Sequence, residues 1–128
     1  MKFLGKYSEE TYSLLRIVAG FMLLFHGAQK LLGLFGDPAH QTAVMTQMWF
    51  GGIIELFGGL LVLIGFQTRW GAFLASGMMA VAYFQFHWKF ALDSNFFPIV
   101  NHGELAVLYC FVFLFIASKG GGKWSLDK

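Results

Sequence analysis

Four long, mostly apolar stretches account for most of the chain, and polar connections separate them. Each stretch is close to the length of about 20 residues that an α-helix needs to cross a bilayer. The second and third are joined only by residues 67–69, which predicts a tight antiparallel hairpin. The stretches cover residues 11–34, 48–66, 70–88 and 98–118. The pattern predicts an all-α integral membrane protein with a single domain, residues 1–128, folded as an up-and-down bundle of four transmembrane helices.

Residues that start or stop helices lie between the apolar stretches. Asp37 and Pro38 are expected to end the first helix, ahead of a polar loop. Pro98 suits the first turn of the fourth helix, because its missing N–H would have no intrahelical partner there. Ser94 and Asn95 are candidates for capping the start of that helix.

Composition supports the membrane prediction and excludes two function classes. The chain is 57% hydrophobic and 12% charged, whereas a soluble domain carries about 25% charged residues. Trp49, Trp70, Trp88 and Trp124 fall near the predicted helix ends, as in the aromatic belts of membrane proteins. The single cysteine, Cys110, excludes an internal disulfide and a paired-thiol redox site. The absence of basic runs argues against nucleic-acid binding. The apolar composition makes a lipid bilayer the expected partner.

The distribution of lysine and arginine predicts the orientation of the bundle. One end carries both termini, connection 67–69 and six basic residues, namely Lys2, Lys6, Arg69, Lys119, Lys123 and Lys128. The other end carries Lys30 and Lys89. Because basic residues are enriched on the cytoplasmic side, both termini are expected in the cytoplasm. The predicted location is the bacterial inner membrane, with the longer loops on the outer side.

Glycines predict where helices meet. Gly20 and Gly27 lie along the first helix, and Gly51, Gly52, Gly58 and Gly59 flank Glu55 on one face of the second. Small residues allow the backbones of membrane helices to approach closely. These glycines therefore predict packing contacts between helices.

Charged and polar residues inside the apolar stretches indicate where function lies. A charged residue at the bilayer centre costs about 2.5 to 3.5 kcal/mol on insertion scales, so such residues face the bundle interior or a wet cavity. His26, Glu55 and Glu104 come from three different helices. The helical rise of about 1.5 Å per residue places all three roughly 10 Å below the outer interface. They are the predicted catalytic residues, able to move protons or bind a ligand.

Four further polar residues lie near this layer and are predicted to bind a cofactor. They are Gln29, Lys30, Asn101 and His102. A histidine and a carboxylate at one depth can bind carbonyl oxygens and exchange protons, which suits a quinone ring. On the third helix either Gln85 with Lys89 or Tyr83 with His87 faces inward, and the pattern leaves both open.

Other uses of the same residues remain open. They can form a structural hydrogen-bond network between helices. His26 and His102 can also be axial ligands of a haem, although neither lies in a distinctive motif. A dedicated metal site formed by His26, Glu55 and Glu104 is a further alternative, although no strong metal motif predicts it. Transport of a small solute would need an oligomer, because four helices make a narrow pathway.

Arg16 is predicted to have a structural role. It lies about one turn inside the end of the first helix that carries the N-terminus. Glu9, Glu10 and Asp127 are candidate partners. Asp127 is favoured because the tail, residues 122–127, has the composition of an interfacial segment that folds back. The expectation is an ion pair between Arg16 and Asp127.

Several short motifs resemble those of the DoxX family of small bacterial membrane proteins. They are Leu15-Arg16-Ile17, His26-Gly27-Ala28-Gln29-Lys30-Leu31, Gly52-Ile53-Ile54-Glu55-Leu56-Phe57-Gly58-Gly59, His102-Gly103-Glu104-Leu105-Ala106 and Trp124-Ser125-Leu126-Asp127. The resemblance covers nearly the whole chain and rests on the order and spacing of the motifs together. It implies a four-helix membrane fold, consistent with the helix prediction.

The resemblance also suggests a functional setting. Some relatives are membrane subunits of thiosulfate:quinone oxidoreductases, and another is associated with a superoxide dismutase and a sulfurtransferase in a membrane oxidoreductase complex. The leading hypothesis is a membrane subunit of an oxidoreductase system that interacts with quinone. Its candidate partners are redox proteins and further copies of the chain. The alternative is a non-enzymatic membrane adaptor or chaperone, with either a lipid-facing stripe or the tail, residues 120–128, carrying the contact.

Overall fold

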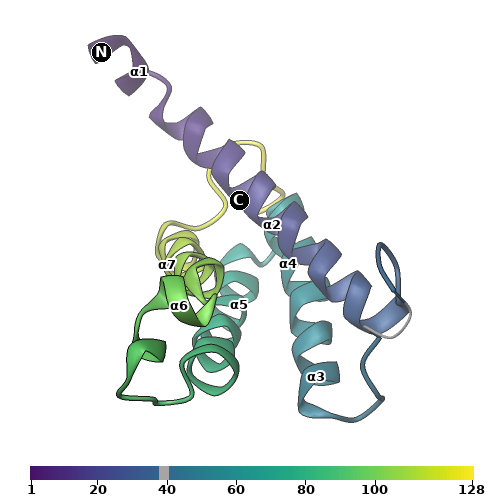
Figure 1. The fold of residues 1–128 in the computed structure, drawn as a ribbon. Coiled ribbons are helices and arrows are strands. Elements are labelled where there is room, and N and C mark those ends of the chain that lie inside the picture. Colours follow the sequence, from purple (N-terminus) through teal and green to yellow (C-terminus); the bar gives the residue numbers. More distant parts are fainter. Residues whose placement is uncertain (38–40) are drawn as a thin grey trace.

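The described residues of the computed structural model, 1–37 and 41–128, are helical without β-strands (Figure 1). Pro38, one of the expected helix-ending residues, lies outside the described residues. The α-helices are α1 (Lys2–Gly5), α2 (Ser8–Leu32), α3 (Gln47–Ile53), α4 (Gly59–Ile64), α5 (Thr68–Ala82), α6 (Pro98–Asn101) and α7 (Glu104–Lys119). Two π-helical segments, η2 (Ile54–Gly58) and η3 (Tyr83–Trp88), and one 3-10 turn, η4 (Ser94–Phe96), complete the helical elements.

The four predicted stretches correspond to four helical segments, and two of these contain π-helical turns. The second segment runs through α3, η2 and α4, so its middle is π-helical around Glu55. The third runs from α5 directly into η3, which holds His87. Single π-turns inside α-helices are frequent at functional sites, because they shift side chains out of the regular register.

The fourth segment is broken, which corrects the expected continuous helix 98–118. His102 has φ 60° and ends α6, and α7 begins only at Glu104. Asn101 stabilises the break, since its Oδ1 accepts a hydrogen bond from the Gly103 amide at 2.8 Å. Pro98 lies in the first turn of α6, as expected. Asn95 instead caps η3, donating to the carbonyls of His87 and Trp88.

The helices pack as two pairs (Figure 1). α2 lies against α3, η2 and α4, while α7 lies against α5. Backbones touch along the first pair: a Cβ atom on Gly20 would lie 2.8 Å from the Gly59 carbonyl, and one on Gly27 would lie 2.7 Å from the Gly52 carbonyl. Four of the predicted glycines therefore lie at this close contact, namely Gly20, Gly27, Gly52 and Gly59. Gly58 faces the Gly71 carbonyl of α5 instead, and Gly51 has only the Met78 side chain near it, at 3.8 Å.

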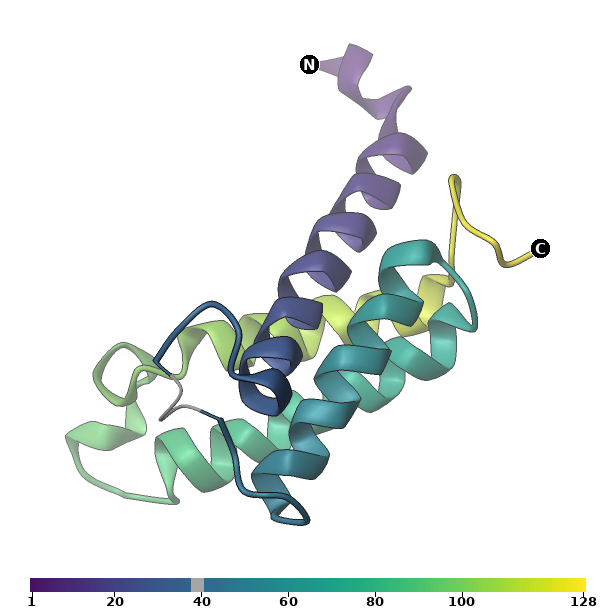
Figure 2. The same cartoon turned by 90° about the vertical axis from the view of Figure 1, so that its right-hand side faces the viewer.

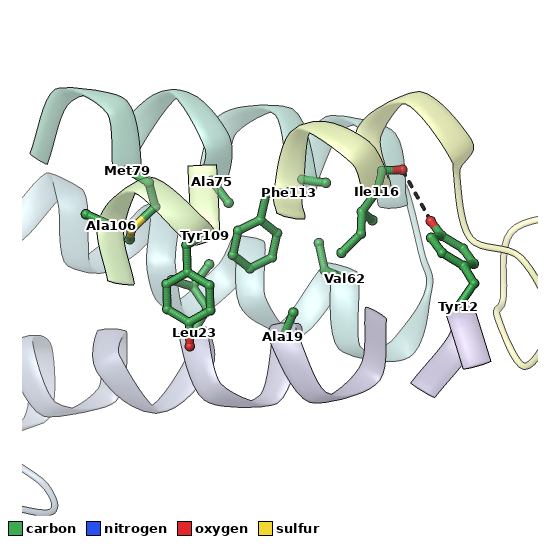
Figure 3. Packing of buried hydrophobic residues seen from close by; sticks show 11 residues of the cluster. Tyr12, Ala19, Leu23, Val62, Ala75, Met79, Ala106, Tyr109, Phe113 and Ile116 are labelled. Carbon is green, nitrogen blue, oxygen red and sulfur yellow. Dashed lines mark hydrogen bonds between the residues drawn. The ribbon is translucent and has the colours of Figure 1, made fainter. Parts of the chain in front are cut away.

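The two pairs meet in a core of apolar side chains (Figure 3). Leu23 from α2, Val62 from α4 and Phe113 from α7 are fully buried there. Tyr109 reaches from α7 toward α2 at one edge of this core (Figure 3). Near the α4–α5 turn the core ends at Tyr12 and Ile116.

The C-terminal tail, residues 120–128, folds back onto the turn between α4 and α5 (Figure 2). The amides of Leu126 and Asp127 donate to the carbonyls of Ile64 and Gly65. We call the end of the bundle that holds this tail the tail end. Because of these contacts, the segment considered above for partner binding is part of the fold.

Arg16 and Asp127 both hold the tail, but through backbone groups rather than through the ion pair that the sequence suggested. The Arg16 guanidinium is fully buried and donates to the carbonyls of Val62 and Leu63, at 2.6 and 2.8 Å. It also donates to the carbonyl of Trp124 at 2.6 Å. The Asp127 carboxylate instead accepts from the amides of Gln67 and Thr68 at the start of α5.

The outer surface of the bundle is rich in large apolar side chains. Phe73, Leu108 and Phe111, for example, are all more than half exposed. Two of the described helices are long and apolar enough to cross a membrane, Ser8–Leu32 and Gln47–Ile64. A protein with such a surface needs an apolar surrounding, because contiguous exposed apolar area is rare on soluble monomers.

Candidate functional site

A polar cavity of 260 Å³ lies at the end of the bundle opposite the tail end. We call this the cavity end. All four helical segments line it, with His26 and Lys30 from α2, Glu55 from η2, His87 from η3 and Tyr109 from α7 among the lining residues. His102, at the break between α6 and α7, also lines it. The π-turns and the break thus place three of these polar side chains.

An ion pair forms one wall of the cavity. The Lys30 Nζ donates to the Glu55 Oε1 at 2.7 Å, and the Glu55 side chain is only 3% exposed. Lys30 is one quarter exposed and borders the cavity with its charged end. Lys30 was predicted to bind a cofactor and Glu55 to be catalytic, and the structure brings the two into contact.

Two buried oxygens at the cavity have no hydrogen-bond partner among the described residues. They are the second carboxylate oxygen of Glu55 and the hydroxyl of Tyr109. A buried polar group without a partner costs about 1 to 3 kcal/mol, so such a group calls for a ligand or a functional reason. One oxygen is an acceptor, and the other can donate a proton to a ligand.

Tyr109 was missed by the sequence analysis. It lies in an aromatic, apolar run that gives no polar periodicity, next to Cys110. The available signal was its amphipathic ring, because a tyrosine hydroxyl deep in a membrane helix needs a polar partner. Its ring also packs edge-on against His26, with the centroids 6.4 Å apart.

Three histidines surround the ion pair. His26 lies close enough to Glu55 for an electrostatic interaction between them. The Nδ1 of His87 lies 3.2 Å from the carbonyl oxygen of Asn101, within hydrogen-bond distance. His87 also lines the cavity. The inward face of the third helical segment is therefore the one that holds His87. Gln85 lies on the outer side and accepts a hydrogen bond from Gln47.

The remaining predicted site residues lie outside the cavity. Glu104 is exposed in the first turn of α7 and is absent from the cavity lining. Gln29 donates to the carbonyl of Phe35 on the outer side of α2. Asn101 supports the α6–α7 break and donates to the hydroxyl of Tyr83. The equal-depth argument failed for Glu104 because depth does not determine which way a helix face points.

An apolar groove adjoins the cavity. It has a volume of 530 Å³ and runs between α3 and α5, which spread apart toward the cavity end (Figure 1). Lys30, Ala82 and His87 line both spaces, so the polar and apolar volumes are neighbours. The rest of the groove lining is almost entirely apolar.

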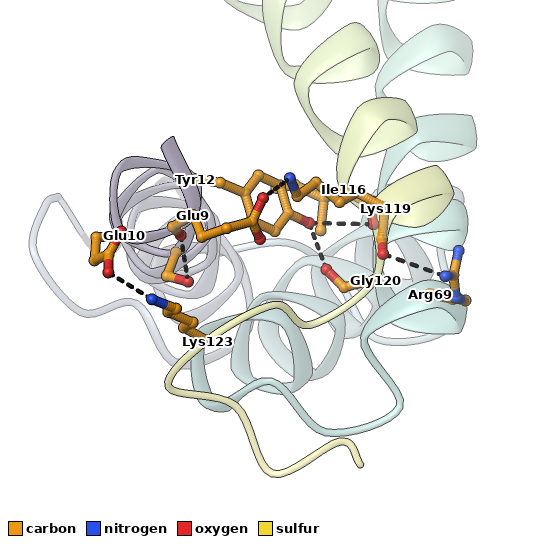
Figure 4. Close-up of polar contacts among 9 residues, drawn as sticks. Glu9, Glu10, Tyr12, Arg69, Ile116, Lys119, Gly120 and Lys123 are labelled. Atoms are coloured by element: carbon orange, nitrogen blue, oxygen red, sulfur yellow. Dashed lines mark hydrogen bonds and ion pairs between the residues drawn. The ribbon is translucent and has the colours of Figure 1, made fainter. Parts of the chain in front are cut away.

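The tail end has a different kind of polar chemistry (Figure 4). Lys119 pairs with Glu9 and Lys123 pairs with Glu10, each at 2.6 Å. Arg69 donates to the last carbonyls of α7, from Ala117 to Lys119. These contacts tie α2, the tail and α7 together, and each of these charges has a protein partner.

Two groups of the tail have shifted pKa values. The pKa of Lys123 is raised by its hydrogen bond to Glu10. The pKa of Asp127 is lowered, chiefly by hydrogen bonding to Thr68 and also by the Gln67 amide. Both shifts favour the charged forms and strengthen the attachment of the tail.

Among the described residues, no group of three or more histidine, cysteine or acidic side chains is arranged to hold a metal ion. Imidazole side chains such as those of the cavity histidines can form hydrogen bonds and exchange protons near neutral pH.

Comparison with known proteins points to one family. The DoxX family model matches residues 11–88. A Haemophilus influenzae protein described as uncharacterized is 38% identical over 137 residues, covering 99% of this chain and 96% of its own length. The inner membrane protein YqjF of Escherichia coli is 28% identical over 104 residues, covering 81% of this chain and 72% of its own length. No solved structure matches the chain.

Proposed function

The chain belongs to the DoxX family of membrane proteins, and from that premise we propose that it is a membrane subunit of an oxidoreductase system that binds a quinone in the polar cavity. The observation that carries the proposal is the pair of unpartnered oxygens on Glu55 and Tyr109. Glu55 and Tyr109 both line one cavity, beside a lysine and three histidines.

The two oxygens fit the two redox states of a quinone. The Tyr109 hydroxyl can donate to a quinone carbonyl oxygen, and the free Glu55 oxygen can accept from a quinol hydroxyl. A quinone supplies two-electron, two-proton redox chemistry when bound, and a partner redox protein supplies or removes the electrons. The proposed binding of quinone therefore depends on the Tyr109 hydroxyl as hydrogen-bond donor and on the free Glu55 oxygen as acceptor.

The residues around Glu55 suit proton exchange. Lys30 holds one Glu55 oxygen at 2.7 Å, which leaves the second oxygen of this cavity-lining residue without a partner among the described residues. His26 and His102 line the same cavity on its exposed side, and imidazoles exchange protons near neutral pH. Glu55 and His26 therefore keep their predicted proton-handling roles in this proposal, whereas Glu104 has none. Tyr109 and His87 join the binding group.

All four helical segments cross the bilayer in this proposal, with both termini in the cytoplasm. The third segment is helical over residues 68–88, which corresponds to about 30 Å at 1.5 Å per residue, the thickness of the hydrocarbon core. The tail end carries six basic residues, and it would face the cytoplasm. The cavity would then open in the outer half of the inner membrane.

The experiment is quinone binding to the protein in lipid nanodiscs, followed by quenching of tryptophan fluorescence. Glu55→Gln and Tyr109→Phe each remove one hydrogen-bonding property of the cavity and are expected to weaken binding about tenfold. Matched controls are Glu104→Gln and Tyr7→Phe, which make the same changes at exposed positions outside the cavity.

The controls separate a cavity effect from a general one. Binding that survives both cavity substitutions, or that falls equally in the controls, would contradict the proposal. Extraction of quinone from the protein purified in mild detergent gives an independent readout. We expect co-purified quinone in the unmodified protein and less of it in Glu55→Gln.

A further inference from the structure

We propose that the apolar groove between α3 and α5 holds the hydrocarbon tail of the quinone, which enters the cavity sideways from the lipid. This inference rests on the proposed function and adds that the protein selects ligands by their tail. A ring without a long tail would use the cavity alone.

The groove and the cavity are positioned as one amphipathic site. Lys30 and His87 line both spaces and lie where the two adjoin. Beyond them the lining is apolar, from Phe86 and Val81 to Leu74 and Phe73. A ligand with a polar ring and an apolar chain matches this change of character along the site.

The length of the groove also suits a chain. It follows α5 and η3 from His87 to Phe73, which corresponds to about 20 Å along a helix axis. Gly77 lies within this stretch, and a Cβ atom built on it would meet no heavy atom within 4 Å. The glycine therefore leaves open volume in the groove rather than a close helix contact.

A hydrogen bond links the two walls of the groove near the cavity end, whereas the far part of the groove is open to the outer surface. Gln47 from α3 donates to Gln85 from η3 at 2.5 Å, linking the two helical segments near the cavity end. Phe73 and Leu74 are more than half exposed on the outer surface, where lipid would lie. This arrangement favours entry of an apolar chain from the bilayer rather than from water.

The test compares two probes that share one ring. One is dimethoxy-methyl-benzoquinone without a tail, and the other is the same ring carrying a decyl chain. Gly77→Phe fills the groove without touching the cavity lining. In nanodiscs we expect it to weaken binding of the decyl probe at least about tenfold, because buried CH₂ groups of the chain lose their site. Binding of the tail-less probe should be unchanged.

A matched control and a second variant complete the design. Gly5→Phe makes the same change in α1, where a Cβ atom also meets nothing within 4 Å. It should leave both affinities unchanged and corrects for partition of the probes into lipid. Leu74→Trp adds bulk at another exposed position of the groove and should reproduce the selective loss if Gly77→Phe does not fold.

The outcomes distinguish the two proposals. Loss of the decyl probe alone supports the groove assignment. Loss of neither probe overturns it and leaves the ring-binding proposal standing. Equal loss of both probes also overturns it, because the substitution then disturbs binding of the ring and not of the chain alone. Failure of the unmodified protein to bind either probe overturns the quinone proposal itself, and the groove assignment with it.

Discussion

Arg16 at the tail end and Lys30 at the cavity end lie on the same helix, yet the structure treats the two cations differently. Arg16 is fully buried and donates to backbone carbonyls of α4 and of the tail. Lys30 is partly exposed, pairs with Glu55 and borders a cavity. One charge is enclosed by the fold, whereas the other remains accessible to a ligand.

The backbone around these two residues also differs between the two ends of the bundle. Near Arg16, α2 and α4 touch through Gly20 and Gly59, and the helices are regular. Near Lys30, the facing segments contain the π-turns η2 and η3 and the break at His102. Close packing leaves no room for a ligand, while irregular turns leave polar groups incompletely satisfied around a cavity. We therefore expect substitutions at the tail end to lower stability and substitutions at the cavity end to affect the proposed ligand binding.

The largest expected effect is on stability, from Arg16→Met. It removes the donor of several buried carbonyls and releases the tail, so we expect a loss of about 4 kcal/mol in the free energy of unfolding. Reversible unfolding in mixed SDS micelles measures it. The comparison variant is Glu55→Gln at the cavity end, which should change stability by no more than about 1 kcal/mol. Equal losses in both would remove the division between the two ends.

The next effect concerns the helix contact near the tail end. A Cβ atom on Gly59 would lie 2.5 Å from the Leu24 amide nitrogen and 2.9 Å from the Gly20 carbonyl oxygen. Because both are backbone atoms, Gly59→Val should cost about 3 kcal/mol of stability, measured by the same unfolding assay. Gly77→Val is the matched control, since its Cβ meets nothing within 4 Å. If Gly59→Val is as stable as the unmodified protein, the contact between α2 and α4 can accommodate a larger side chain, and the prediction is wrong.

The smallest effect is pH-dependent and lies in the tail. The folded-state pKa of Asp127 is lowered, so its contribution is present above the unfolded value near 4 and is lost as pH falls through the lowered pKa. Asp127→Asn should cost about 1 kcal/mol at pH 7, the usual cost of a lost N-cap, and should flatten the acid side of the stability profile. An unchanged acid limb in Asp127→Asn would mean that another carboxylate controls it.

The chain pattern predicted much of this architecture. Four apolar stretches became four helical segments, and four of the six glycines predicted at helix contacts lie where the first two segments touch. The membrane assignment and the DoxX family were also readable, because both depend on composition and local motifs. Lys30 and Glu55 were recognisable as site candidates because ionisable residues in apolar stretches are costly without a use.

Other features depended on how the segments face one another. Glu104 was predicted to join Glu55 but is exposed and outside the cavity lining. Tyr109 lines the cavity from an apolar run that carries no motif. His87 faces inward on a π-turn whose register regular helical spacing does not describe. Arg16 found carbonyls of a distant turn and of the tail instead of Asp127. The sequence by itself determined the membrane class, the helical segments and the identity of the costly charges, because these follow from local hydrophobicity. Only the tertiary structure decided which charges are enclosed and which line a cavity, because that depends on helix rotation and on contacts between residues far apart in the chain.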